Sequence, residues 1–217
     1  MHSSPLRIAV AQKGARDHYL IPRALHRCGA LAQCIVDWHT SPALRQWAQA
    51  VDNRFLQRIA RAFVPGIPEH RIADMKDVAL LRTVIGEAGR MAGCRHAAYA
   101  WTDALFARRV AATTMLPHNV FIGYSYASLE ALKEERKQGR ITVVQQINPG
   151  RYEWHLVQRE TEKWPLYAHP ETKEPDRYFR RTEEEWKVAD LIVVNSEWTW
   201  HALEKQGAPP EKLHIVP

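Results

Sequence analysis

The chain alternates short apolar runs with longer segments in which apolar residues recur every three or four positions. Short runs of this kind are typical of strands buried in a parallel sheet, and the longer spacing is typical of amphipathic helices. The predicted strands are residues 7–12, 33–38, 118–124, 141–147, 191–194 and 213–216. The predicted helices between them are residues 19–32, 129–138, 152–164, 176–189 and 197–206. This order predicts an α/β fold, in which a Rossmann-like parallel sheet carries helices on both faces.

Residues 40–117 interrupt this alternation. They contain no convincing strand, and helical patterns fill them at 44–63, 72–91 and 95–114. So much helix is long for a single connection between two strands. We therefore expect a helical insertion or a lid-like subdomain at about 40–117, within one domain that spans residues 1–217.

The charge distribution divides the chain in two. Residues 1–117 hold 16 Lys and Arg against 8 Asp and Glu, and residues 118–217 hold 14 against 16, which together give the net charge of +6. A basic first half can attract an anionic partner such as a sugar nucleotide, a phospholipid surface or a nucleic acid. A solvated basic surface explains the excess equally well, and nucleic acid is the least favoured partner.

Composition also bears on location. No apolar run is long enough to span a membrane, and the first residues lack the regions of a signal peptide. The three cysteines, Cys28, Cys34 and Cys94, have no CxxC spacing, so we expect buried thiols in a reducing, cytoplasmic compartment. The arginines of residues 45–61 lie beside an apolar stripe that includes Trp47. Peripheral membrane contact is therefore an alternative to packing of this helix into the core.

Polar residues collect where the predicted strands end. In an open parallel sheet, ligands bind beyond the carboxyl ends of the strands, where helix N-termini also present free N–H groups. Five segments meet this description: 13–18, 38–39, 124–128, 146–150 and 195–197. The candidate substrate-binding residues within them are Lys13, Gly14, Arg16, His18, Tyr124, Ser125, Tyr126, Gln146, Asn148, Asn195, Ser196 and Glu197.

Several candidates also have a purely structural explanation. Gly14 lets the backbone approach a phosphate or a sugar closely, but a bare tight turn needs the same residue. Tyr124 and Tyr126 can stack on a sugar ring or pack as half-buried side chains. The amides of Gln146 and Asn148 end an apolar strand, which slightly favours polar recognition over a role in the turn.

The helix starts raise the same question. Ser128 and Ser196 each precede a predicted helix and fit the N-cap position, and Glu197 suits the positive end of the helix dipole. No Walker phosphate loop, zinc-protease motif or serine-hydrolase motif is present, and no histidines cluster at ligand spacing. We therefore expect no metal and no cofactor, and the catalytic residues are unknown.

Two stretches carry a resemblance to a known family. A helix that ends at Ala189-Asp190 leads into LIVVNSEWT at 191–199, then a helix to Gly207 and PEKLHIVP at 210–217. FIGYSYASLEAL at 121–132 is followed by a helix to Gly139 and ITVV at 141–144. These stretches resemble the N-terminal domain of GT-B glycosyltransferases, specifically glycosyltransferase family 4. The resemblance is good over 118–217, looser over 6–38 and poor over 40–117.

The resemblance implies a retaining glycosyltransferase of the hexosyltransferase type, with two Rossmann-like domains that face each other across a cleft. In such enzymes the N-terminal domain mainly binds the acceptor, and the C-terminal domain binds the nucleotide-sugar and carries a Glu-x7-Glu pair. Transfer usually needs no metal, and the nucleotide-sugar is a co-substrate rather than a cofactor. Lys13-Gly14 would then lie in the loop that approaches the donor phosphates. The polar residues after the 118–124 strand would lie on the side of the acceptor, which is a sugar, a glycan or a lipid-linked molecule.

Nothing in the chain corresponds to the donor-binding domain of that family. We therefore expect an N-terminal half of a GT-B fold that has little or no transferase activity alone. The alternative is a stand-alone α/β binding or regulatory module without catalytic activity.

Overall fold

The computed structural model of the protein describes residues 5–167 and 175–217. Seven strands form one sheet, in which every neighbouring pair is parallel, in the order β3-β2-β1-β4-β5-β6-β7. The strands are β1 Ile8–Gln12, β2 Leu31–Val36, β3 Ile72–Asp74, β4 Val120–Tyr124, β5 Ile141–Gln145, β6 Leu191–Val194 and β7 Leu213–Ile215. The strand order reverses between β1 and β4, as in Rossmann-like sheets. The predicted α/β fold is confirmed.

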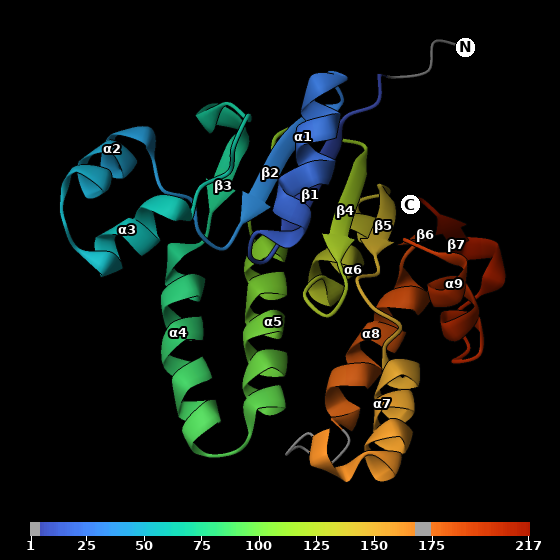
Figure 1. Ribbon diagram of the computed structural model, residues 1–217. Coiled ribbons are helices and arrows are strands. Elements are labelled where there is room, and N and C mark those ends of the chain that lie inside the picture. Colours follow the sequence, from blue (N-terminus) through green and yellow to red (C-terminus); the bar gives the residue numbers. More distant parts are fainter. Residues whose placement is uncertain (1–4, 168–174) are drawn as a thin grey trace.

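Helices cover both faces of this sheet (Figure 1). Their bounds are α1 Leu20–Arg27, α2 Pro42–Ala50, α3 Arg54–Arg61, α4 Lys76–Met91, α5 Arg95–Ala111, α6 Leu129–Lys137, α7 Arg151–Lys163, α8 Asp176–Val188 and α9 Glu197–Glu204. Side chains alternate between the faces along each strand. Ala9 of β1 packs in one core cluster with Phe106 of α5 and Trp186 of α8, whereas Val10 packs in the other with Leu25 of α1.

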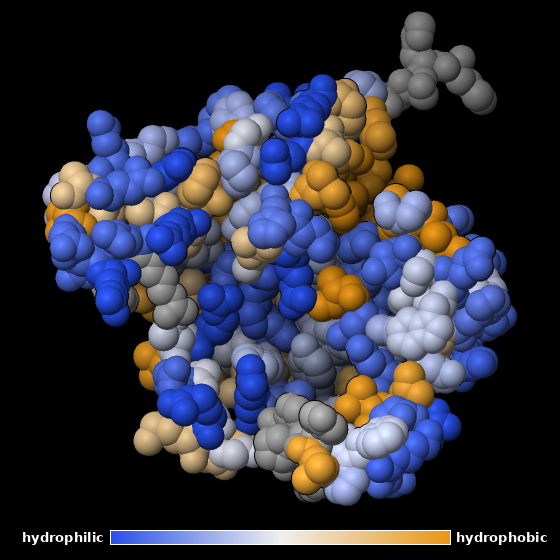
Figure 2. Space-filling view, in the orientation of Figure 1, coloured by the Kyte–Doolittle hydropathy of each residue, from blue (hydrophilic) through white to orange (hydrophobic). Residues whose placement is uncertain are grey.

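Two pairs of helices extend beyond the carboxyl edge of the sheet (Figure 1). α4 and α5 form a hairpin after β3, and α7 and α8 follow β5. α5 contacts α6 and α8, so the two pairs meet below the centre of the sheet. Figure 2 shows a hollow in the surface between them. The helices thus form two walls around the edge at which a ligand is expected.

The structure corrects one prediction for residues 40–117. The segment is helical over α2, α3, α4 and α5, but the prediction that it contains no strand was wrong. Residues Ile72–Asp74 form β3, which pairs with β2. A strand of three residues is too short for a period-two pattern, and the apolar spacing of α4 directly after it extends a helical pattern over it. The segment is therefore joined to the sheet through β3.

Other differences are local. β2 begins at Leu31 rather than residue 33, because Gly29 adopts a left-handed φ of +76° and ends the preceding helical region early. Cys34 is buried as predicted, but Cys28 and Cys94 are exposed. α2 leaves Trp47 55% exposed, so this helix does not bury its whole apolar stripe. None of the described helices has the length and apolar content needed to cross a bilayer.

Candidate functional site

The candidate site lies at the carboxyl edge of the sheet, around the reversal of strand order. Because all the strands are parallel, the five predicted polar segments share this edge. The loops after β1 and β4 flank the reversal point, and the loop after β5 is the next one along. Residues 195–197 follow β6, one strand further away. Residues 38–39 follow β2, the neighbour of β1 on the other side, so the structure groups four of the five predicted segments and leaves residues 195–197 apart.

The loop after β1 is held in a fixed conformation by its neighbours. Gly14 has a left-handed φ of +75°, and its N–H donates to Asp37 Oδ1 at 2.8 Å. Gln12 Nε2 donates to the carbonyls of Gly14 and Arg16, at 3.1 and 3.3 Å. Three further left-handed residues, 17–19, follow at φ values of 47°, 49° and 61°. Such conformations are costly for residues other than glycine and persist only where the surroundings impose them.

Lys13 is committed to a partner inside the chain. Its ammonium donates to Thr102 Oγ1 at 3.0 Å and forms an ion pair with Asp103, also on α5. The two side chains are 9% and 7% exposed. Burial lowers the pKa of Lys13 and raises the pKa of Asp103, although each charge opposes the shift of the other. Lys13 therefore ties the β1 loop to α5.

Arg16 is the cation of this loop that remains unengaged. Its half-buried guanidinium has no hydrogen bond or ion pair to any residue of 5–167 or 175–217. Its charge acts on the hydroxyls of Tyr124, Tyr126 and Tyr178, where it opposes the increase in pKa that burial causes. His18 is exposed. Arg16 thus provides positive charge beside the tyrosines of the neighbouring loop.

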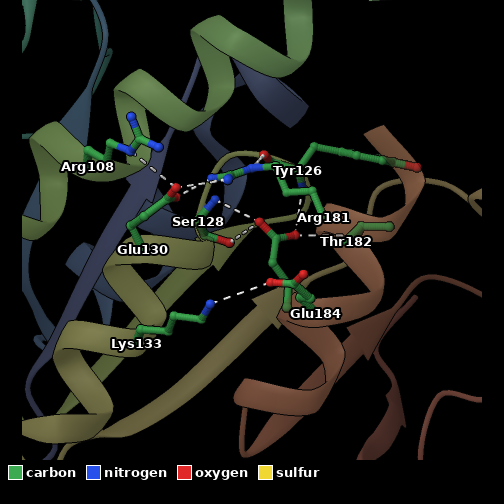
Figure 3. A network of polar contacts seen from close by, with 9 residues as sticks. Arg108, Tyr126, Ser128, Glu130, Lys133, Arg181, Thr182 and Glu184 are labelled. Carbon is green, nitrogen blue, oxygen red and sulfur yellow. Dashed lines mark hydrogen bonds and ion pairs between the residues drawn. The ribbon is translucent and has the colours of Figure 1, made fainter. Parts of the chain in front are cut away.

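A buried carboxylate of α8 organises the loop after β4. Glu185 accepts hydrogen bonds from the N–H groups of Tyr126 and Ser128, at 2.7 and 2.9 Å. The hydroxyls of Ser128 and Thr182 lie at 3.3 Å from its two oxygens. Figure 3 shows how Tyr126, Ser128 and Thr182 surround this position. Burial raises the pKa of Glu185 to about 7.

This network corrects the prediction for Ser128. The residue stands at the N-cap position of α6, but its hydroxyl makes no hydrogen bond to the helix backbone. It contacts Glu185 instead, and the same carboxylate accepts the N–H of Ser128 itself. A capping role was inferred from local sequence alone, whereas the partner lies 57 residues away in the chain. The carboxylate of α8 thus satisfies free N–H groups at the start of α6.

Arg181 holds the same loop from its other side. Its Nε donates to the carbonyl of Tyr126 at 2.7 Å, and its Nη1 donates to Glu130 Oε1 at 3.0 Å. Arg108 of α5 lies 3.5 Å from the same oxygen of Glu130 (Figure 3). Both backbone polar groups of Tyr126 are therefore bound by α8. This explains how Tyr126 retains a left-handed φ of +72°.

A pocket of about 340 Å³ opens beside Tyr126. Its walls come from α5, α7, α8 and the loops after β4 and β5. Most of its large side chains are aromatic: His96, Tyr99, Tyr126, Trp154, Tyr178 and Phe179. Polar side chains interrupt this lining at Arg95, Asn148, Glu153 and Gln158. Ligand pockets commonly combine mostly apolar walls with a few such polar groups.

The aromatic rings of the pocket pack against one another. Tyr126 and Tyr178 stack with centroids 4.1 Å apart and planes 5° from parallel. Trp154 meets His96 edge-on at 5.8 Å and Phe179 at 6.3 Å. Tyr126 thus packs against Tyr178, and stacking of Tyr126 on a sugar ring stays a prediction. Tyr124 is 1% exposed and packs in the core cluster of α1, away from the pocket lining.

The loop after β5 places one of its two amides at the pocket. Asn148 Oδ1 accepts hydrogen bonds from the hydroxyl of Tyr126 at 2.8 Å and from the N–H of Gly150 at 3.0 Å. Gln146 is 1% exposed, accepts from Trp186 Nε1 and donates to the carbonyl of Asn148, both at 2.8 Å. Asn148 therefore faces the pocket, and Gln146 supports the loop from within.

The remaining predicted residues lie outside the pocket lining. Ser125 Oγ accepts from the N–H of Ile147 at 3.3 Å and joins the loops after β4 and β5. Ser196 Oγ accepts from the N–H of Thr199, which confirms its capping of α9. Asn195 Oδ1 accepts from the hydroxyls of these same two residues, and Glu197 is exposed. Substrate binding by residues 195–197 stays a prediction.

Several residues on which the pocket and its supports depend were not predicted from the sequence. Glu153 and Trp154 lie in the first turn of α7, directly after the polar segment 146–150, so their closeness to it in sequence could have identified them. Asp103 and Glu185 are carboxylates on the buried faces of α5 and α8, and a carboxylate at a buried position indicates a buried polar partner. Over the described ranges, no group of three or more His, Cys, Asp and Glu side chains is placed to hold a metal ion.

Among the comparisons with known proteins, only the comparison with solved structures found similar proteins. No protein-family model matches the chain, and no curated protein matches its sequence. A Listeria monocytogenes protein described as a UDP-N-acetylglucosamine 2-epimerase superposes with a TM-score of 0.46 at 9% identity, covering 98% of this chain and 45% of that one. A UDP-glucosyltransferase from Polygonum tinctorium gives 0.41 at 9%, covering 100% and 53%. A Phytolacca americana protein, UGT2, solved with UDP-2-fluoro-glucose and pterostilbene, gives 0.41 at 10%, covering 100% and 54%. The chain thus spans about half the length of these structures.

Proposed function

We propose that the chain is the acceptor-binding half of a retaining GT-B glycosyltransferase, which moves a sugar from a nucleotide-sugar to an acceptor hydroxyl. The stretches that resemble glycosyltransferase family 4 form β4-α6-β5 and α8-β6-α9-β7, which are consecutive parts of the sheet. The pocket lies where the first of these units meets α7 and α8. We assign the acceptor to this pocket.

The aromatic pocket beside Tyr126 is the observation that supports this proposal most directly. It lies at the carboxyl edge of a Rossmann-like sheet, next to the reversal of strand order, where ligands of such sheets bind. Its loop is held by Glu185 and Arg181, so the lining is fixed before a ligand arrives. A preformed lining reduces the entropy lost on binding.

The loop after β1 is the proposed approach for the nucleotide-sugar phosphates. A Cβ added at Gly14 would meet nothing within 4 Å, so the space in front of this residue is open. The unengaged guanidinium of Arg16 supplies positive charge at the same loop. Because Lys13 is paired with Asp103, Arg16 is the better candidate for contact with a phosphate.

The test is a transfer assay on the natural gene product with a panel of nucleotide-sugars, comparing wild type with Gly14→Val. We expect Gly14→Val to lower kcat/KM at least tenfold, because a branched side chain at φ +75° distorts the loop and fills the open space. Gly139→Val is the matched control, since Gly139 has φ +73° and open surroundings but follows α6, remote from the pocket. Equal activity of the two folded variants contradicts the assignment of the loop.

A stand-alone binding or regulatory module is the second candidate. Two observations favour it: Lys13 forms an ion pair with Asp103 inside the chain, and Glu197 lies outside the pocket lining. Such a module binds a ligand at the pocket and transfers nothing. Saturable ligand binding by the natural gene product, with no transfer from any nucleotide-sugar, identifies this case.

A further inference from the structure

Two polar groups of the aromatic pocket have no partner among the residues that the structure describes. Glu153 lines the pocket from the first turn of α7 and is half-buried. Its carboxylate makes no hydrogen bond or ion pair with the described part of the chain, although other acidic side chains of α7 and α8, such as Glu160 and Glu183, are paired. An ionised carboxylate is an acceptor only, so Glu153 presents acceptor oxygens to whatever enters the pocket.

Asn148 presents a donor to the same space. The N–H of Gly150 can only donate, so the side-chain atom 3.0 Å from it must be the amide oxygen of Asn148. The hydroxyl of Tyr126 also donates to this oxygen. The amide NH₂ therefore points away from both groups, and among residues 5–167 and 175–217 it has no acceptor.

The two groups and the rings together favour a hydroxylated ring as ligand. A hydroxyl can donate to Glu153 and accept from Asn148, while the C–H face of a saturated ring packs on the aromatic side chains. An aromatic or lipid alcohol brings a single hydroxyl, so it leaves part of the hydrogen-bonding capacity of the two groups unsatisfied, whereas a sugar ring brings several hydroxyls. An organic cation would make no use of the Asn148 donor and would share the pocket with Arg95.

We propose that this pocket binds a pyranose ring, with Glu153 and Asn148 on its hydroxyls. Its volume of about 340 Å³ is at the small end of the range for ligand sites and suits one sugar ring rather than an extended chain. The acceptor is thereby a carbohydrate. The role of this carbohydrate as the acceptor rests on the proposed function, whereas the binding of a pyranose ring to the pocket does not.

The experiment is an NMR titration of the 217-residue chain with methyl glycopyranosides, p-cresol and tetramethylammonium as separate probes. We expect saturable shifts with at least one glycoside at the Asn148 side-chain amide and the Trp154 indole. Glu153→Gln removes the charge but keeps the shape, and should weaken binding about tenfold, as expected for one hydrogen bond to a charged group. Glu160→Gln is the matched control, because Glu160 lies on the same helix as Glu153 but is exposed and outside the pocket lining. It should leave the affinity unchanged.

Three results would overturn the proposal. They are glycoside binding that is equal in wild type and Glu153→Gln, shifts that avoid Asn148 and Trp154, and saturable binding of p-cresol or tetramethylammonium where no glycoside binds. The identity of the resonances that shift is measured on the wild-type protein alone, so this test holds even if a variant fails to fold. Glycoside binding without sugar transfer by the natural gene product would defeat the proposed function alone. Transfer to a non-carbohydrate acceptor, without glycoside binding, would defeat the pyranose assignment alone.

Discussion

Single residues decide how the site is held, and Glu185 is the clearest case. It is fully buried, yet each of its oxygens accepts a backbone N–H from the loop after β4. Those bonds favour the charged form, and desolvation disfavours it more strongly, which raises its pKa to about 7. The residue that positions the pocket loop therefore changes its protonation near neutral pH.

This pKa predicts a pH-dependent stability. The folded pKa lies above the ordinary value of 4.5, so the contribution is fully present below pH 4.5 and is lost as the pH rises through about 7. The free energy of unfolding of wild type, relative to Glu185→Gln, should fall by on the order of 3 kcal/mol between pH 4.5 and 8. Urea denaturation across this range measures the difference. The exposed Glu184, as Glu184→Gln, should show no such trend.

Gly123 sets how closely α6 approaches β4. A Cβ at this position would lie 2.4 Å from Ser128 Cβ, which is far inside van der Waals contact. Gly123→Ala should therefore lower the free energy of unfolding by about 1–3 kcal/mol through overpacking. Gly86→Ala, in α4 with no neighbour within 4 Å, should instead gain a few tenths to about 1 kcal/mol from helix propensity. Thermal or urea denaturation of both variants checks this, and equal effects would contradict the packing argument.

At the scale of elements, contacts between segments far apart in the chain connect the loops to the helices. The Lys13–Asp103 pair joins the loop after β1 to α5 across 90 residues. The Glu185 bonds join α8 to the start of α6 across 57 residues. Lys212 Nζ donates to the carbonyls of Trp186, Lys187 and Ala189 and closes the C-terminal end of α8. Each contact gives a buried polar group a partner and so offsets the free-energy cost of its desolvation.

The Lys13–Asp103 pair yields a prediction by double-mutant cycle. Lys13→Met leaves the Asp103 carboxylate buried without its cation, and should lower the free energy of unfolding by about 3–5 kcal/mol. Lys13→Met combined with Asp103→Leu removes both charges and should recover most of that loss. Urea denaturation of the two single variants and the double variant measures the coupling. A double variant as unstable as the sum of the singles would show that the pair is not coupled.

These elements also show what the sequence could predict. β6 is bounded as predicted, because an apolar run lies between the polar residues Asp190 and Asn195. β3 was missed because three residues carry no periodic signal. The position of the candidate site at the carboxyl edge of the sheet could be predicted, because it follows from the parallel arrangement of the strands alone. The pocket walls did not, since Tyr178 reaches Tyr126 from 52 positions away and only tertiary packing brings the two rings together.

For the whole molecule, the main feature is the pair of helical walls below the sheet (Figure 1). α5 belongs to the connection between β3 and β4, whereas α7 and α8 belong to the connection between β5 and β6. The pocket between them thus draws on both sides of the reversal point. The basic first half of the chain and the slightly acidic second half meet at this pocket, with Arg95 on one wall and Glu153 on the other.

This arrangement has a consequence for the order in which ligands bind. A molecule that contacts both α5 and α7 immobilises two helices that reach the pocket from different parts of the sheet. The conformational entropy that these helices lose makes the free energy of binding less favourable. The loop after β1 is bonded to α5 through Lys13, so it shares in that immobilisation. A second ligand that arrives at Gly14 and Arg16 then meets a loop that has already been ordered. Occupation of the pocket should therefore favour an ordered sequence, in which the pocket ligand binds first and strengthens the binding of the second.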